Sequence, residues 1–265
     1  MPVIDESTIR YLNYLVKSYE GLTKLLAATR QRVRHINPEM TPENDDLVQR
    51  LEKLKGRLGR QIGKQLVYWP LWSEWLEKVP GIGPAYAGRL IFFHYYRMEP
   101  VCQKCGGDLR KAEGGMHCAA CGQTAAGDGI LSYRIGRRHF PKVSSWWHFM
   151  GMHVVDGKKP KRAKGQRADW STPGRTLCHL IGYQFVKTPG HYRDFYDLRR
   201  ARREKTHPDA SKGHRHNMAA HETAKLFLAH LWHVARVLDG KEPTRPYAHT
   251  VMGHTQFIAP FYFEP

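Results

Sequence analysis

The sequence predicts a mainly α-helical protein that combines a coiled-coil-like helical hairpin, a helical domain containing a helix-hairpin-helix element, and an inserted four-cysteine ribbon. Three observations support this prediction. Apolar residues repeat at helical spacing in long stretches at both ends of the chain, two Cys-x-x-Cys pairs interrupt its middle, and a Pro-Gly-Ile-Gly turn precedes them. The expected segments are a helical hairpin at 1–68, a helix-hairpin-helix at 69–99, the ribbon at 100–129, a basic helical domain at 130–240 and an irregular tail at 241–265.

The N-terminal segment carries the pattern of two amphipathic helices, at residues 5–36 and about 43–66. The steps Asn37-Pro38 and Thr41-Pro42 interrupt the helical pattern between them. Thr41 or Asn44 is expected to cap the second helix. Such a pair can form an antiparallel hairpin, pack on the main domain, or pair with a second copy in a homodimer. The two expected apolar stripes are Ile9, Leu12, Val16, Tyr19, Leu22 and Leu26, and Leu47, Leu51, Leu54, Leu58 and Ile62.

The four cysteines of the middle segment have the spacing of a metal site. The pairs are Cys102 with Cys105 and Cys118 with Cys121, with twelve residues between them. Four thiolates at this spacing can close a tetrahedral Zn²⁺ site, and four protein ligands are typical of structural rather than catalytic zinc. Glycines follow each pair, where a tight turn needs a positive φ. The alternative is a redox pair or disulfides, and the fifth cysteine, Cys178, is expected to be a free thiol.

The turn at residues 80–83 resembles the helix-hairpin-helix element of DNA-binding proteins. Gly81 and Gly83 leave the backbone bare on either side of Ile82, so that the N–H groups of this turn can meet a phosphate at the start of the following helix. Arg89 on that helix is expected to add positive charge. The alternative is a tight turn between two helices that binds nothing.

The charge balance favours a polyanionic partner. Lys and Arg total 42 against 24 acids, which gives a net charge of +18. A loop after residue 157 and a later helix concentrate this charge and are expected to contact phosphates, although a solvated surface is the alternative. The candidate nucleic-acid contacts outside the hairpin are Arg137, Arg138, Lys158, Lys159, Lys161, Arg162, Lys164, Arg167, Arg199, Arg202 and Arg203.

Three further helices are expected after residue 170. Ser171 is placed to cap the first, and the others are expected at about 192–205 and 216–238. Few carboxylates or cysteines stand near the histidines, so a second metal site is not expected. The sequence has no run of about 18 apolar residues, so no membrane span is expected. The N-terminus lacks the apolar region of a secretory signal. The expected location is cytoplasmic, associated with the nucleoid.

From about residue 10 to residue 240, the order of these elements resembles the C-terminal half of insertion-sequence 110/116/902 family transposases, which include the pilin-gene inverting recombinases. The likeness rests on the helical segment 9–66, the hairpin 80–83, the stretch Phe140–Met152, the loop Val154–Arg167 and the helix start Ser171–Arg175. It implies a transposase-like domain that binds DNA or RNA. The cysteine ribbon is then an insertion between the hairpin and the Phe140 stretch.

Two departures from that family affect catalysis. The family's N-terminal RuvC-like domain, with its metal-binding acids, has no counterpart here, and Asp156-Gly157 stands where the resemblance places a loop serine. Ser171 is the weak remaining candidate for a nucleophile. We therefore expect a protein that grips DNA, or a guide RNA–DNA complex, without cutting it. The alternatives are an active transposase that uses a serine or a partner nuclease subunit, with Mg²⁺ only in that case, and a zinc-ribbon RNA-binding protein.

Overall fold

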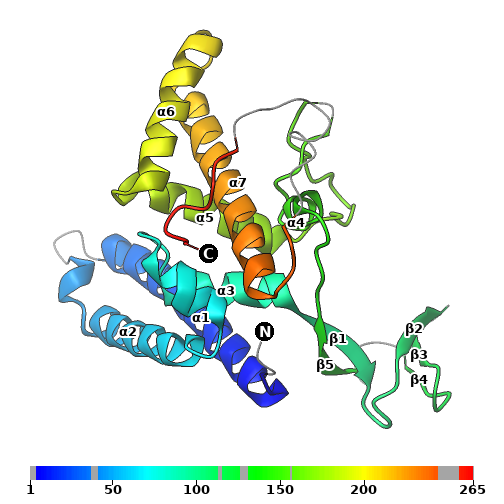
Figure 1. Cartoon of the computed structure of the whole chain (residues 1–265). Coiled ribbons are helices and arrows are strands. Elements are labelled where there is room, and N and C mark those ends of the chain that lie inside the picture. Colours follow the sequence, from blue (N-terminus) through cyan, green and yellow to red (C-terminus); the bar gives the residue numbers. More distant parts are fainter. Residues whose placement is uncertain are drawn as a thin grey trace.

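Helices make up most of the chain in a computed structural model, which describes residues 4–36, 41–112, 115–125, 131–155, 157–243 and 257–264. The prediction of a mainly helical protein is confirmed. Figure 1 shows α1, α2 and α3 on one side of the molecule and α5, α6 and α7 on the other, with the strands projecting away from both groups. Among the described residues, no helix is long and apolar enough to cross a membrane.

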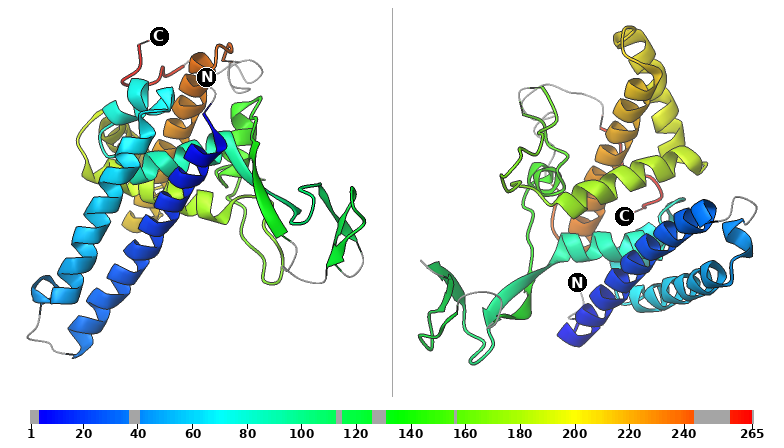
Figure 2. Two further views of the ribbon diagram at one scale, coloured as in Figure 1. Left: turned by 90° about the horizontal axis from the view of Figure 1, so that it is seen from below. Right: turned by 180° about the vertical axis from the view of Figure 1, so that it is seen from behind.

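The N-terminal helices α1 (Glu6–Ile36) and α2 (Asp46–Leu66) lie side by side and are joined by the 3-10 turn η1 (Pro42–Asn44) (Figure 2). The cap of α2 is Asp45, whose carboxylate accepts a hydrogen bond from Val48 N at 2.8 Å. The expectation that Thr41 or Asn44 would cap this helix is therefore wrong, because α2 begins at Asp46 and Asp45 is the residue that directly precedes it.

The stripe predicted for α1 is largely buried, whereas the stripe predicted for α2 is buried only in part. Ile62 is buried as predicted, and Leu51 and Leu58 are half-buried. Leu47 is 54% exposed and Leu54 is 40% exposed, and the other buried residues of α2 are Val48 and Leu66. The face that α2 turns inward is thus rotated by about one residue from the predicted stripe at its N-terminal end. The reason is that α2 packs against both α1 and α3, so its position between two neighbours decides which face is covered.

The next segment packs short turns and one apolar helix into the centre of the molecule. A π-helical turn, η2 (Leu71–Trp75), and a 3-10 turn, η3 (Leu76–Lys78), precede α3 (Pro84–Tyr95). Eight of the twelve residues of α3 are buried, which is expected of a helix that is apolar on nearly all sides. The first of the two helices predicted around the hairpin is therefore replaced by irregular turns.

The strands lie in the middle of the chain, in and on either side of the segment predicted as the four-cysteine ribbon. Helix α3 continues directly into β1 (Tyr96–Cys102), which pairs antiparallel with β5 (Leu131–Arg137). Beyond this two-stranded ribbon lies a small sheet in the order β2 (Leu109–Ala112), β3 (Gly115–Cys118) and β4 (Thr124–Ala125). The ribbon holds this sheet away from the helices (Figures 1 and 2).

Four helices complete the fold: α4 (Val143–Phe149), α5 (Thr172–Lys187), α6 (His191–Thr206) and α7 (Lys212–Leu238). The predicted Ser171 cap of α5 is confirmed, since its hydroxyl accepts from Gly174 N at 3.0 Å. Helix α7 begins earlier than predicted, because Ser211 caps it. One hydrophobic core runs from Ile9 in α1 to Ala235 in α7, so the segment boundaries predicted near residues 68 and 99 fall inside a shared core.

The final described segment, 257–264, packs back onto the helices. Trp75 Nε1 donates to Phe261 O at 2.7 Å, and His230 Nε2 lies 3.1 Å from Ile258 O. The His191 N–H donates to the Tyr262 hydroxyl at 2.9 Å. These bonds join the C-terminal end to η2, α6 and α7. Residues 244–256, the rest of the predicted irregular tail, lie outside the described residues.

Close packing of α5 on α7 gives a prediction about Gly182. A Cβ at this position would lie 2.7 Å from Ala220 O, a backbone atom that cannot move aside easily. We predict that Gly182→Ala lowers the free energy of unfolding by about 1–3 kcal/mol despite the better helix propensity of alanine. Gly21 in α1 has no atom within 4 Å of such a Cβ, so Gly21→Ala should raise stability by up to about 1 kcal/mol. Chemical denaturation of both variants measures the contrast, which equal effects would contradict.

The buried His94 predicts a loss of stability in mild acid. Burial, and then the charges of Lys241 and His139, lower the pKa of His94 to about 3 from 6.5. Between these values the unfolded chain binds a proton that the folded chain does not, so stability falls as the pH falls below about 6.5. We predict a loss of about 2 kcal/mol from this histidine between about pH 7 and pH 5. His94→Phe should remove that part of the dependence in denaturation curves, while replacing the exposed His35 by Gln should leave it.

Candidate functional site

The four cysteines predicted as ligands lie together at the end of the β1–β5 ribbon. All four Sγ atoms are within 4.8 Å of one another. Cys102 Sγ lies 3.7 Å from Cys121 Sγ, and Cys105 Sγ lies 3.4 Å from Cys118 Sγ. Sulfurs bound tetrahedrally at about 2.3 Å from one ion stand about 3.8 Å apart, so these distances fit a single ion with little movement. The cluster can hold a metal ion.

Two matching turns bring these thiols together. Gly106 and Gly122 have φ values of +70° and +71°, which residues with a side chain rarely adopt. Gly106 N donates to Cys102 O at 2.8 Å, and Gly122 N donates to Cys118 O at 3.1 Å. In the second turn, the backbone N–H of Cys121 is the first cause that lowers the pKa of Cys118, and the N–H of Ala120 adds to it. The backbone therefore stabilises a thiolate, which is the form that binds metal.

A second group of possible ligands, which the sequence did not indicate, consists of His148, His153 and Asp169. His148 Nε2 lies 3.2 Å from Asp169 Oδ2. The two imidazoles are stacked at 4.1 Å with an interplanar angle of only 13°. Ligand lone pairs lie in the ring plane, so two parallel stacked rings cannot both point at one ion unless a ring rotates. In this arrangement the group is a histidine stack with an ion pair at one end.

The predicted hairpin has an open surface at Gly83 and a buried charge behind it. Gly81 adopts φ +90° and Ile82 is buried, whereas Gly83 is exposed and a Cβ there would meet nothing within 4 Å. Arg89 is only 7% exposed, forms an ion pair with Glu20 of α1, and lies over the Phe93 ring at 4.6 Å. Its guanidinium thus serves the packing of α3 on α1 and is not presented at the hairpin surface.

The basic loop after residue 157 presents its charges to solvent. Its six cations are exposed and form no ion pair with another described residue; they are Lys158, Lys159, Lys161, Arg162, Lys164 and Arg167. Arg175 of α5 anchors the loop by donating from Nη1 to Pro160 O at 2.7 Å. Asp156, the one acid that the sequence places in this loop, lies outside the described residues. The loop therefore concentrates positive charge on one side of α5 and α7.

The other predicted arginines are divided between paired and exposed positions. Arg199 and Arg203 of α6 both form ion pairs with Glu222 of α7, while Arg202 is exposed. Arg138 donates from Nε to Tyr96 O at 2.8 Å and lies over the Phe149 ring, and Arg137 lies over the Tyr96 ring at 4.9 Å. Arg138 therefore joins the ribbon to the helices, and the α6 arginines join α6 to α7.

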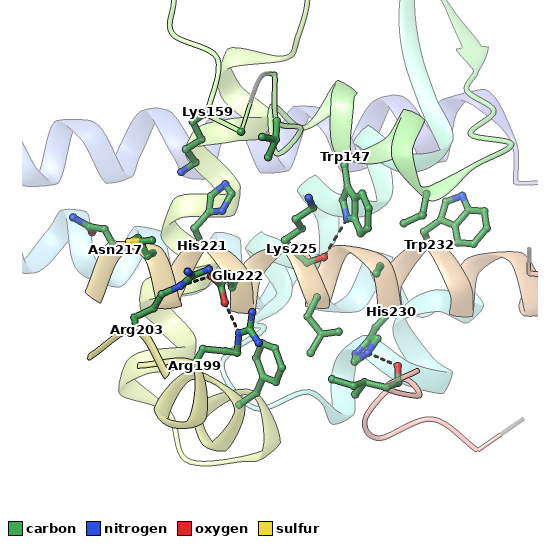
Figure 3. Close-up of a pocket in the computed structure, with 18 of the residues that line it drawn as sticks. Trp147, Lys159, Arg199, Arg203, Asn217, His221, Glu222, Lys225, His230 and Trp232 are labelled. Carbon is green, nitrogen blue, oxygen red and sulfur yellow. Dashed lines mark hydrogen bonds and ion pairs between the residues drawn. The ribbon is translucent and has the colours of Figure 1, made fainter. Parts of the chain in front are cut away.

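A cavity of about 940 Å³ lies between the basic loop, α4, α6, α7 and the segment 257–260. Figure 3 shows Lys159 reaching from the loop toward His221 on α7, with Lys225 further along the same helix and Trp147 facing Lys225 from α4. The sequence did not indicate this site, because its lining comes from five segments whose proximity depends on the fold. The only signal in the sequence was the joint presence of basic, aromatic and histidine residues in α7 and the loop.

The weak candidate nucleophile, Ser171, has a structural role. Its hydroxyl oxygen accepts the hydrogen bond that caps α5, and its N–H donates to Phe149 O at 2.8 Å. These bonds fix the start of α5 against the end of α4. Among the described residues, no carboxylate forms an ion pair with a cation of the basic loop.

Comparisons with known proteins identify no relative. No protein-family model, curated protein or solved structure matches this chain.

The geometry of the cysteine cluster gives a prediction that Co²⁺ can test. We predict that the metal-free protein binds one equivalent of Co²⁺ with the intense thiolate charge-transfer absorption of a four-sulfur site. Cys121→Ser should lower that absorption per bound ion and weaken binding, because one thiolate is lost. Cys178→Ser is the matched control, since Cys178 is buried in the helical core and its Sγ lies 3.9 Å from Met150 O. A spectrum without sulfur bands, or one altered equally in both variants, would contradict the assignment.

Proposed function

We propose that this protein binds nucleic acid, with duplex DNA as its first target, and that the basic loop supplies the main phosphate contacts. The observation that carries this proposal is the exposed cation cluster at residues 158–167, which has no acidic partner among the described residues. Together with a net charge of +18, such a cluster attracts a polyanion and releases its counterions on binding. The open backbone at Gly83, in a helix-hairpin-helix-like turn, offers a second phosphate contact.

We further propose that the metal of the cysteine cluster is zinc and that its role is structural. Four thiolates fill the coordination sphere of Zn²⁺ and leave no position for substrate. The cluster also stands at the end of the β1–β5 strand pair, which projects away from the helices, so the ion would stabilise a zinc ribbon at the tip of that pair (Figure 1). In that position the zinc ribbon could contact a part of the nucleic acid that the basic loop does not reach.

The resemblance to the C-terminal half of insertion-sequence 110/116/902 family transposases is the reason for preferring DNA, or a guide RNA–DNA complex. We infer binding by this chain rather than strand cleavage, because the Ser171 hydroxyl is engaged as a helix cap. A partner nuclease subunit that binds Mg²⁺ would supply cleavage where it occurs. Structured RNA is the alternative target, and the exposed Tyr11, Tyr14 and Leu25 of α1 offer a surface for a second copy.

We predict that replacing Arg162, Lys164 and Arg167 together by Gln weakens binding to duplex DNA of any sequence. These side chains are exposed and lie outside the cavity, so their loss should remove phosphate contacts without disturbing the fold. The slope of log K against log salt should become shallower by up to about three units. Fluorescence anisotropy over a salt series, with one arbitrary duplex and a second of shuffled sequence, measures both quantities.

The matched control for this triple variant replaces three exposed cations on the opposite, N-terminal side of the chain: Arg32, Arg34 and Lys53. This change lowers the net charge equally but spares the loop. An equal loss of affinity in both triple variants would show that net charge alone drives binding and would overturn the assignment to the loop. Tighter binding of a structured RNA than of a duplex of equal length would favour the RNA alternative.

A further inference from the structure

The cavity beside α7 combines uncompensated positive charge with an apolar wall. Among the described residues, its lining includes three cations from the basic loop and Lys225 from α7, but only one acid, Glu222. Arg199 and Arg203 bind both oxygens of that carboxylate. No carboxylate of the described residues forms an ion pair with Lys159 or Lys225, so the cavity carries net positive charge in a partly desolvated place.

These charges converge on one neutral imidazole. His221 Nε2 is buried and has no hydrogen-bond partner among the described residues. Burial, followed by the charges of Lys159, Lys225 and Arg175, lowers the pKa of His221 to about 3. Burial in the same region lowers the pKa of Lys159 to about 8. A buried polar atom without a partner, surrounded by three cations, is a position where an anionic oxygen would gain several favourable interactions at once.

The rest of the lining suits a flat apolar group. Lys225 Nζ lies over the indole ring of Trp147, 4.4 Å from its centroid. The indole Nε1 of Trp147 donates a hydrogen bond to Lys225 O at 3.1 Å. Phe195 and Trp232 add further aromatic surface to the wall. Aromatic side chains with adjacent cations are the usual platform on which unpaired bases stack. A volume of about 940 Å³ is also within the range of cavities that enclose small organic ligands.

We propose that this cavity binds one unpaired nucleotide of a nucleic-acid strand, with its phosphate beside Lys159, Lys225 and His221 and its base along Trp147. The proposal rests on the proposed function, since the basic loop that would hold the duplex also forms one wall of the cavity. The recognised chemistry is that of a nucleoside monophosphate. A free mononucleotide is therefore both the simplest probe and the competing source of the same ligand.

Calorimetry on the full, zinc-loaded chain tests the ligand chemistry first. The probes are adenosine 5′-monophosphate, adenosine and inorganic phosphate. The monophosphate should bind at least about tenfold more tightly than either of the others, because only it uses both the cations and the apolar wall. Lys159→Gln and Lys225→Gln should each weaken its binding by about fivefold or more. Binding no tighter than that of inorganic phosphate would overturn the proposal.

Lys164→Gln is the matched control, since it removes the same charge from the same loop at a residue that does not line the cavity. It should change the affinity for the monophosphate by less than about twofold, because a distant exposed charge is screened. An effect as large as that of Lys159→Gln would assign the binding to general surface charge and overturn the cavity as the site. Thermal unfolding of each variant confirms that the comparison is made between folded proteins.

A second arm separates a strand from a free nucleotide. A duplex with a one-nucleotide 5′-phosphorylated overhang should bind more tightly than the blunt duplex by about fivefold or more, and Lys225→Gln should remove that preference. No preference for the overhang would overturn the assignment to a strand. Failure of the proposed function gives a different result. If duplexes do not bind but the monophosphate binds through Lys225, the proposed function is wrong and the cavity is a site for free nucleotides.

Discussion

Burial of α3 is the constraint on which the rest of the structure depends. This helix is apolar on nearly all sides, so it must be covered by α1, α2 and the helices of the C-terminal half. Gly88 allows α1 to approach closely, since a Cβ there would lie 2.9 Å from Val16 Cγ2. Because α3 continues into β1 without a loop, its direction also sets the direction of the ribbon and hence the position of the cysteine cluster.

The features that depend on local spacing could be predicted from the sequence, and those that depend on distant neighbours could not. The helical periodicity, the Ser171 cap and the four convergent cysteines follow from residues close together in the chain. The pairing of β1 with β5 joins residues that are far apart in the sequence, from Tyr96 with Arg137 to Cys102 with Leu131, and no local pattern predicts it. Arg89 was expected at a phosphate for the same reason: its partner, Glu20, belongs to another helix.

The acids of this basic chain are not spread evenly over its cations. Glu222 lies between Arg199 and Arg203, Glu20 pairs with Arg89, and Glu99 bridges Arg97 and Arg134. These ion pairs join elements of the fold, and in each of them a carboxylate compensates the charge of an arginine. The cations of the basic loop, and Lys225 in the adjoining cavity, form no ion pair with a described carboxylate, so part of the net charge becomes a local positive field there.

That field acts differently at the two places. The loop cations outside the cavity, Arg162, Lys164 and Arg167, are exposed. Their attraction reaches about 10 Å before salt screens it, so under the proposed function they would suit contacts to any phosphate backbone. In the cavity, Lys159 and Lys225 lose part of their hydration, as the lowered pKa of each shows, and burial is the first cause in both. Charges in that setting are screened less and act over short distances. Under the proposed function, the loop would therefore bind a strand whether or not it is paired, whereas the cavity would favour an unpaired nucleotide that can leave the duplex.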